Sequence, residues 1–233
     1  MVNSRTASGG ALRRESPFFV AHRAGNDLAK LRAAEEYGLD LVEADIRLFH
    51  GRLEVRHLKT LGPIPFLWDR WEVANPFAPR LYLRDLLAST APDTELMLDL
   101  KGRSRRLAIG VLAELRPTLG SRRVTVCARA WPLLEPFEGL PGVRTIHSVG
   151  NVRQLQALLR LGRAHRLQGI SIHERLLTPD SVADLRGVAD LVMTWPANAV
   201  ERTRELLAMG VDGLITDRLD LANQLDPAGE RPA

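Results

Sequence analysis

The chain has 233 residues, of which 45% are hydrophobic and 26% are charged, so it can bury the core of one large domain. It contains no apolar run of 18 residues, and its first sixteen positions lack an apolar segment, which argues against a membrane span and a secretory signal. Cys127 is the single cysteine, so an intrachain disulfide is excluded. We therefore expect a cytoplasmic protein without a transmembrane segment, for which peripheral membrane contact stays open.

The positive charge comes mostly from arginine. The formal net charge is +4, and lysine occurs only at Lys30, Lys59 and Lys101. The arginines are spread along the chain without interleaved aromatic residues, and no helix-turn-helix pattern or zinc-finger spacing is present. We expect no nucleic-acid partner, and the rarity of lysine draws attention to Lys101.

The amino-terminal part of the chain begins with a polar segment. Residues 1–16 lack periodicity and predict a disordered tail, and the polar residues 226–233 predict a flexible one. Residues 18–22 form an apolar run of strand length that ends in His22 and Arg23. A turn at residues 24–27 and a helix that ends at Gly38 should follow. No linker interrupts residues 17–225, which we expect to form one domain.

The second predicted strand, residues 39–48, is followed by an extension. His50 and Gly51 indicate a tight turn that leads into residues 53–57, so a small β extension should return His57 toward the end of the second strand. Residues 58–80 contain four prolines with Trp68 and Trp71 and show no clear periodicity. We interpret them as a functional loop or lid.

The remainder alternates regularly between strands and helices. Helices are expected at residues 81–89, 105–115, 132–137, 152–161, 179–186, 200–209 and 219–225, and strands at 95–101, 123–129, 144–149, 169–173, 190–195 and 213–217. Eight β/α units in one uninterrupted series predict a single (β/α)₈ TIM barrel of the α/β class, whereas a doubly wound sheet rarely needs so many equal units.

Charged residues gather where the predicted strands end. Glu43 and Asp45 share one face of the second strand, and Asp99 and Lys101 share a face of another. Singly, such charges are usually solvated or paired in salt bridges. Three carboxylates at the carboxyl ends of barrel strands nevertheless suit a hard divalent cation, Mg²⁺ or Ca²⁺, and nearby histidines could act as an acid and a base.

The ordered set of motifs resembles the glycerophosphodiester phosphodiesterases. The motifs are His22-Arg23 after an apolar strand, Leu41-Val42-Glu43-Ala44-Asp45, Leu53-Glu54-Val55-Arg56-His57, Asp99-Leu100-Lys101, Trp195, and Gly210-Val211-Asp212-Gly213-Leu214-Ile215-Thr216-Asp217. They span residues 18–225, nearly all of the expected domain.

The resemblance implies a barrel that hydrolyses a small phosphodiester with one divalent cation, releasing glycerol 3-phosphate and an alcohol. By the same resemblance, Glu43, Asp45 and Asp99 would hold the metal, and His22 and His57 would be the general acid and base. Arg23 and Lys101 would bind the phosphate, and Trp195 would line the substrate pocket. The oligomeric state is not indicated.

The chain departs from the family pattern in three places. Residues 24–27 replace a Pro-Glu-Asn signature, Leu58 follows His57 where an aspartate is expected, and Asp99 takes the place of a glutamate. The shorter carboxylate is similar to the sphingomyelinase D-like branch, so a lysophospholipid or sphingolipid diester is an alternative substrate. A catalytically silent barrel that binds a phosphorylated ligand is a further alternative.

Overall fold

The computed structural model describes residues 17–61, 64–69, 72–74 and 79–225. The two predicted tails, residues 1–16 and 226–233, lie outside the described residues, as does Trp71. The prediction that these tails are disordered therefore stays a prediction.

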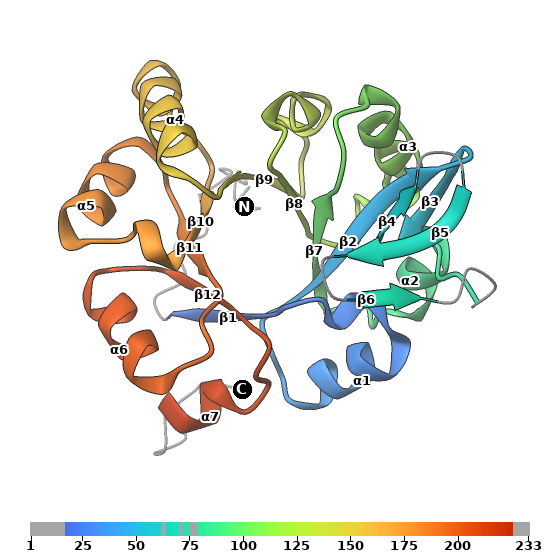
Figure 1. Ribbon diagram of the computed structural model, residues 1–233, viewed down its shortest axis with the longest axis horizontal. Helices are drawn as coiled ribbons and strands as arrows, with labels where there is room; N and C mark the ends of the chain where they lie inside the picture. Colours follow the sequence, from blue (N-terminus) through green and yellow to red (C-terminus); the bar gives the residue numbers. More distant parts are fainter. Residues whose placement is uncertain (1–16, 62–63, 70–71, 75–78, 226–233) are drawn as a thin grey trace, which may run out of the picture.

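Eight parallel strands form a closed barrel, as the sequence predicted (Figure 1). They follow one another around the ring in the order β1 (Phe18–Ala21), β2 (Leu41–Phe49), β7 (Glu95–Leu100), β8 (Val124–Ala128), β9 (Val143–Val149), β10 (Ile170–His173), β11 (Val192–Trp195) and β12 (Gly213–Thr216). Pairing of β1 with both β12 and β2 closes the ring. The far end of β2 extends beyond the ring and pairs antiparallel with β3 (Arg52–Val55).

Helices cover the outside of the barrel between successive strands (Figure 1). They are α1 (Leu28–Glu36), α2 (Leu83–Ser89), α3 (Arg105–Leu115), α4 (Val152–Ala164), α5 (Pro179–Val188), α6 (Val200–Ala208) and α7 (Leu221–Leu225). None of those in the described ranges is both long and apolar enough to cross a membrane.

The helix predicted at residues 132–137 is wrong. The structure has two short 3₁₀ helices there, η3 (Trp131–Leu133) and η4 (Glu135–Phe137). Pro136, in the second of them, falls inside the predicted helix and lacks the backbone N–H that a continuous α-helix would need at that point. A 3₁₀ helix η2 (Arg116–Thr118) also follows α3, and η5 (Glu174–Leu176) follows β10.

Local sequence signals set the ends of several elements. Asp27 caps α1, because its carboxylate accepts hydrogen bonds from the backbone N–H groups of Ala29 at 2.8 Å and Lys30 at 3.1 Å. Gly38 follows the same helix with a φ of 65°, a conformation that favours glycine. His50 and Gly51 both have positive φ at the β2–β3 turn, as a tight hairpin requires.

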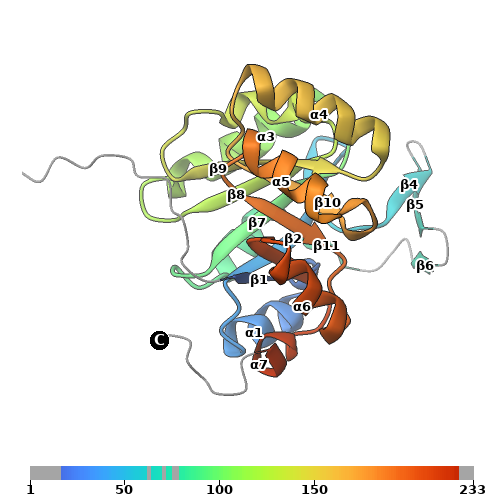
Figure 2. The same cartoon turned by 90° about the vertical axis from the view of Figure 1, so that its left-hand side faces the viewer.

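Residues 58–80 contain regular structure that the sequence analysis missed. β4 (Lys59–Leu61), β5 (Ile64–Asp69) and β6 (Glu72–Ala74) form an antiparallel sheet that stands out from one end of the barrel (Figure 2). The register shifts between Thr60 and Leu61, and such an irregularity interrupts the two-residue period by which a strand is recognised. The loop predicted for this segment is therefore wrong as secondary structure, and its role as a lid stays a prediction.

Alternate strand positions point into the barrel, where a small apolar cluster fills the interior. Its buried members are Phe18, Val20, Leu41, Met97, Cys127, Ile146, Leu191, Met193 and Ile215. Gly213 makes room for Phe18, because a Cβ at position 213 would lie 2.4 Å from Cζ of the phenylalanine ring. Positions of the opposite parity pack outward against the helices. Polar side chains replace the apolar cluster toward the carboxyl ends of the strands, and they form the candidate site.

Candidate active site

Three carboxylates lie together at the carboxyl end of the barrel. Glu43 and Asp45 come from β2, and Asp99 comes from β7, where it is paired in register with Asp45. The three residues offer oxygen atoms that all lie within 4.8 Å of one another. Glu43 is only 3% exposed and Asp45 is fully buried, so these acidic groups need cationic partners.

Residues of the turn after β1 form hydrogen bonds with two of the carboxylates. Arg23, with a φ of 55°, donates its backbone N–H to Oε2 of Glu43 at 2.6 Å. Asn26 donates from Nδ2 to Oδ2 of Asp45 at 2.7 Å, and its own Oδ1 accepts the backbone N–H of Asp45 at 2.8 Å. The close approach depends on Gly25, where a Cβ would lie 2.7 Å from the Cβ of Ala44.

Asn26 is a site residue that the sequence analysis did not select. The sequence shows the altered turn at residues 24–27, but not that its asparagine reaches across to Asp45. The turn therefore does supply a helper group to the carboxylates, although its residues differ from the Pro-Glu-Asn signature. An amide that both donates to and accepts from one aspartate fixes the direction in which that carboxylate points.

Lys101 is the cation that the structure places among the carboxylates. Its Nζ lies 2.8 Å from Oδ1 of Asp45 and also forms an ion pair with Asp99. The negative charges of Asp99 and Asp45 raise the pKa of the ammonium group beyond its usual range despite burial, so it is protonated at neutral pH. One ammonium group then faces three carboxyl groups.

The two carboxyl groups of β2 have pKa values shifted in opposite directions. Burial opposes ionisation of Asp45, but the charge of Lys101 and a hydrogen bond from His57 outweigh it and hold the pKa well below its usual range. Burial and the neighbouring Asp45 charge raise the pKa of Glu43 well above its usual range. Even with the Arg23 guanidinium, whose Nε lies 3.8 Å from Oδ2 of Asp45, the three carboxyl groups outnumber their cationic partners, which fits a hard divalent cation.

His57 is held at the same carboxylate by several groups. Its Nδ1 lies 3.3 Å from Oδ2 of Asp45, and its Nε2 lies 3.0 Å from Nη2 of Arg23. Because a guanidinium group can only donate, Nε2 accepts and the ring proton belongs on Nδ1. Arg47 donates from Nε and Nη2 to the backbone oxygen of His57 at 3.1 and 2.9 Å. These contacts orient His57 although the next residue is Leu58 and not the aspartate expected from the family pattern.

His22 has a carboxylate partner from the last strand of the barrel. Its Nδ1 donates to Oδ1 of Asp217 at 2.7 Å, which leaves Nε2 as the other ring nitrogen. Asn198 donates to Oδ2 of Asp217 at 2.8 Å and accepts the backbone N–H of Asp217 at 2.9 Å. Hydrogen bonding by His22 lowers the pKa of Asp217 to about 2, so this carboxylate is ionised at neutral pH. The sequence analysis did not select Asn198.

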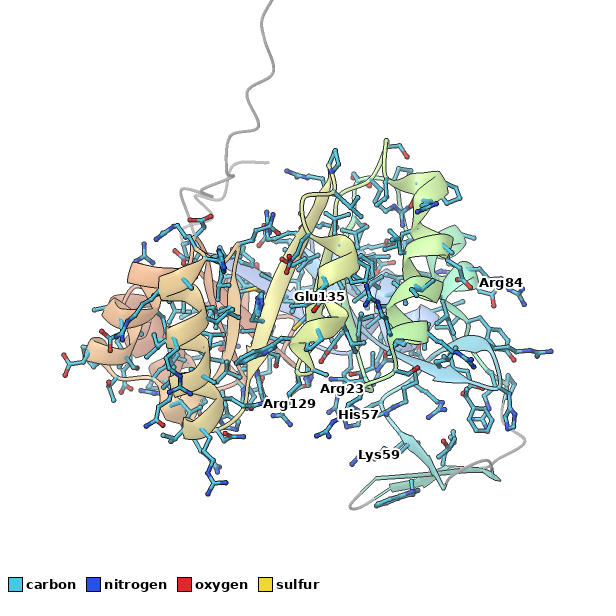
Figure 3. The ribbon with its side chains drawn as sticks, turned by 90° about the horizontal axis from the view of Figure 1, so that it is seen from above. Arg23, His57, Lys59, Arg84, Arg129 and Glu135 are labelled. Atoms are coloured by element: carbon cyan, nitrogen blue, oxygen red, sulfur yellow. The ribbon has the colours of Figure 1, made fainter. Side chains whose placement is uncertain are left out.

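These residues surround a cavity of about 1200 Å³ at the barrel mouth. Figure 3 shows Arg23, His57, Lys59 and Arg129 along the same edge of the molecule. All but one of the sequence-predicted site residues line this cavity: His22, Arg23, Glu43, His57, Asp99, Lys101 and Trp195. The exception is Asp45, which is buried and contacts Lys101 and His57. His173 lines it too, with its ring 4.7 Å from that of Trp195.

Solved structures of other proteins contain a similar barrel. No family model matches this sequence, and no curated protein sequence matches it. A glycerophosphodiester phosphodiesterase from Thermotoga maritima is similar with a TM-score of 0.71 at 19% identity, over 91% of this chain and 100% of that one. One from Parabacteroides distasonis gives 0.71 at 18% identity, over 93% and 100%. The chain has the fold of the glycerophosphodiester phosphodiesterases.

A third similar structure contains a bound product. It is an Oleispira antarctica phosphodiesterase in complex with sn-glycerol-3-phosphate, with a TM-score of 0.69 and 17% identity over 93% of this chain and 98% of that one. At such identities the likeness to glycerophosphodiester phosphodiesterases concerns the fold, so chemistry has to be argued from the side chains of this chain.

Proposed function

We propose that the protein is a phosphoric diester hydrolase that cleaves glycerophosphodiesters to glycerol 3-phosphate and an alcohol. The observation that carries the proposal is the cluster of Glu43, Asp45 and Asp99 at the barrel mouth, with His22 and His57 beside the same cavity. The phosphodiesterase fold and the product bound to the Oleispira antarctica protein support this choice of substrate. We further propose a cytoplasmic location, since Cys127 is the single cysteine and nothing in the sequence requires an oxidising compartment.

The proposal includes one divalent cation, Mg²⁺ or Ca²⁺. Glu43, Asp45 and Asp99 would hold it, because carboxylate oxygens are the preferred ligands of both ions and the cluster has more carboxyl groups than cationic partners. When bound, such an ion would withdraw electron density from a phosphoryl oxygen. Lys101 and Arg23 would compensate the charge of the other phosphoryl oxygens from their places at the cavity wall.

The two histidines are suited to opposite proton transfers. In the unliganded site the lone pair on Nε2 of His57 accepts from the Arg23 guanidinium. Once that guanidinium turns to the phosphoryl group, Nε2 would accept a proton from the attacking water as its oxygen bonds to phosphorus. Nε2 of protonated His22 would donate a proton to the departing alkoxide oxygen when the phosphorus–oxygen bond breaks. The ionised Asp217 at Nδ1 compensates the positive charge of the His22 ring before that transfer. The products are glycerol 3-phosphate and a neutral alcohol.

The experiment measures release of glycerol 3-phosphate from glycerophosphoglycerol by the purified protein with Mg²⁺, with Ca²⁺ or with a chelator. We expect activity that the chelator abolishes, and a loss of at least about 100-fold in His22→Ala and in His57→Ala. His165→Ala, which changes an exposed histidine beyond the end of α4, is the matched control. Release that survives the chelator or both alanine substitutions would contradict the proposal.

A lysophospholipid diester is a second candidate substrate, as for the sphingomyelinase D-like branch. The observation in its favour is Trp68 on β5, whose side chain is 37% exposed. Its ring lies 5.6 Å from Nζ of Lys59, and Lys59 lines the cavity. An acyl chain attached to a diester in the cavity could pack against this aromatic surface.

A further inference from the structure

The cavity has a second chemical feature on the side opposite Asp99. Arg129 follows β8 directly, and its guanidinium carbon lies 5.7 Å from the centroid of the Trp195 ring at the end of β11. In the closed ring, β11 stands four strands away from β7 in either direction. The Arg129 side chain therefore extends across the barrel mouth, from the strand next to Asp99 toward the opposite wall.

Arg129 is exposed, and two neighbours determine where its guanidinium group lies. Trp195 lies beneath it as a stacking surface and is itself packed edge-on against His173. Gly150, just after β9, leaves the space that the guanidinium occupies, because a Cβ there would lie 1.9 Å from Nη2 of Arg129. A guanidinium group that already lies against an aromatic ring loses less conformational freedom on binding an anion than one surrounded by solvent.

Arg129 has no acidic partner within the described part of the chain. The ion pairs of this part do not include it; its guanidinium lies over the Trp195 ring, and burial together with the charge of Arg129 lowers the pKa of His173. Arg153, in the first turn of α4, lines the same cavity and likewise has no carboxylate partner among the described residues. The cations around the cavity outnumber the acidic residues: Arg23, Arg47, Lys59, Lys101, Arg103, Arg129 and Arg153 face Glu43 and Asp99.

We propose that Arg129, stacked on Trp195, forms a subsite for a second anionic group on the alcohol arm of the diester. The inference rests on the proposed function, in which the scissile phosphoryl group lies beside Glu43 and Asp99. A diester bound there extends its alcohol arm toward the opposite wall, where the guanidinium fork matches the geometry of a phosphate group. A cationic arm such as choline is disfavoured, since Trp195 already faces a positive charge.

Two kinds of alcohol arm carry a second phosphate group, and they serve as separate probes. Bis(glycerophospho)glycerol contains a second phosphodiester, whereas a glycerophosphoinositol phosphate contains a phosphomonoester. Glycerophosphoglycerol has an uncharged arm and is the reference. The measured quantity is kcat/KM for each doubly charged diester divided by kcat/KM for glycerophosphoglycerol.

The test compares Arg129→Gln with Arg84→Gln. Arg84 is the matched control, because its guanidinium carbon also lies over an aromatic ring, 5.4 Å from the centroid of Tyr82, and it lies away from the barrel mouth (Figure 3). We expect Arg129→Gln to lower the ratio about 10- to 100-fold for at least one doubly charged diester, the usual range for losing a charged hydrogen-bonded contact. Arg84→Gln should leave the ratio unchanged. An equal ratio in wild type and Arg129→Gln for both diesters overturns the inference.

Gly150→Ala tests whether the position of the Arg129 guanidinium matters, apart from its charge. The added methyl group displaces the Arg129 side chain while the net charge stays the same. We expect the ratio to fall here too, and an unchanged ratio would overturn the subsite. If wild type hydrolyses none of the diesters, the proposed function fails, and calorimetric titration with bis(glycerophospho)glycerol tests the subsite alone. Weaker binding by Arg129→Gln than by Arg84→Gln supports it, and equal binding overturns it.

Discussion

Asp45 is the residue whose surroundings decide what the site can do. Its side chain is fully buried, and its two oxygens receive Asn26 at 2.7 Å, Lys101 at 2.8 Å and His57 at 3.3 Å. Each contact comes from a different segment of the chain. A buried carboxylate is costly unless donors and cations surround it, and such a concentration of charged groups beside a cavity is typical of a functional site.

We predict that Asn26→Ala lowers activity more than its effect on stability can explain. The substitution removes both hydrogen bonds to Asp45, and the loss of a group that orients a metal ligand typically costs about 10- to 100-fold in activity or metal affinity. The measurement is kcat/KM together with the activity as a function of Mg²⁺ concentration. Thr178→Ala, which removes the capping hydroxyl of α5, provides a comparable loss of stability away from the site. Equal activity in the two variants would refute this role of Asn26.

The sheet of β4, β5 and β6 borders the barrel mouth. It stands out from the barrel end (Figure 2), and Lys59 of β4 connects it to the cavity. The exposed ring of Trp68 lies on this sheet, and a water-soluble diester has no apolar group that would pack against it. A large exposed aromatic beside a cavity is typical of a surface that contacts apolar ligands.

We predict that Trp68→Ala reduces hydrolysis of lysophosphatidylglycerol about 10-fold more than hydrolysis of glycerophosphoglycerol. The two substrates share a headgroup and differ in the acyl chain, so the difference reports on contact between that chain and the indole ring. Tyr37→Ala changes another exposed aromatic, at the end of α1, and should affect both substrates equally. A similar loss on both substrates in Trp68→Ala would exclude the contact.

At the scale of the whole molecule, stability should depend on pH through His147. This histidine lies on β9, is 5% exposed, and packs outward with its ring 5.8 Å from that of Trp131. Burial lowers the pKa of His147 to about 4. The unfolded chain therefore takes up a proton near pH 6.5 that the folded chain does not accept until about pH 4.

We predict that the free energy of unfolding falls as the pH drops from about 6.5 to about 4, by up to about 3 kcal/mol from His147 alone. Above pH 6.5 both states are neutral at this position, and the contribution of the histidine is constant. Urea unfolding of wild type and His147→Gln at pH 7.5 and at pH 4.5 provides the measurement. The variant should lose less stability than wild type over this interval, and parallel losses would rule out His147 as the cause.

The barrel and the position of its acidic cluster could be predicted from the sequence alone. Strand and helix periods are local properties of a chain, and the carboxyl ends of parallel strands meet at one end of any such barrel, so Glu43, Asp45 and Asp99 were expected to meet. The sheet of β4–β6 was missed because its register shift interrupts the local period.

Only the tertiary structure decided which groups surround these carboxylates. Asn26 reaches Asp45 across 19 positions, and His22 meets Asp217 across 195 positions, where closure of the ring brings β1 beside β12. Arg129 reaches Trp195 because β8 and β11 face one mouth. The physical reason is that hydrogen bonds and stacking depend on distance in space, whereas a periodic pattern records only which side of an element each residue occupies.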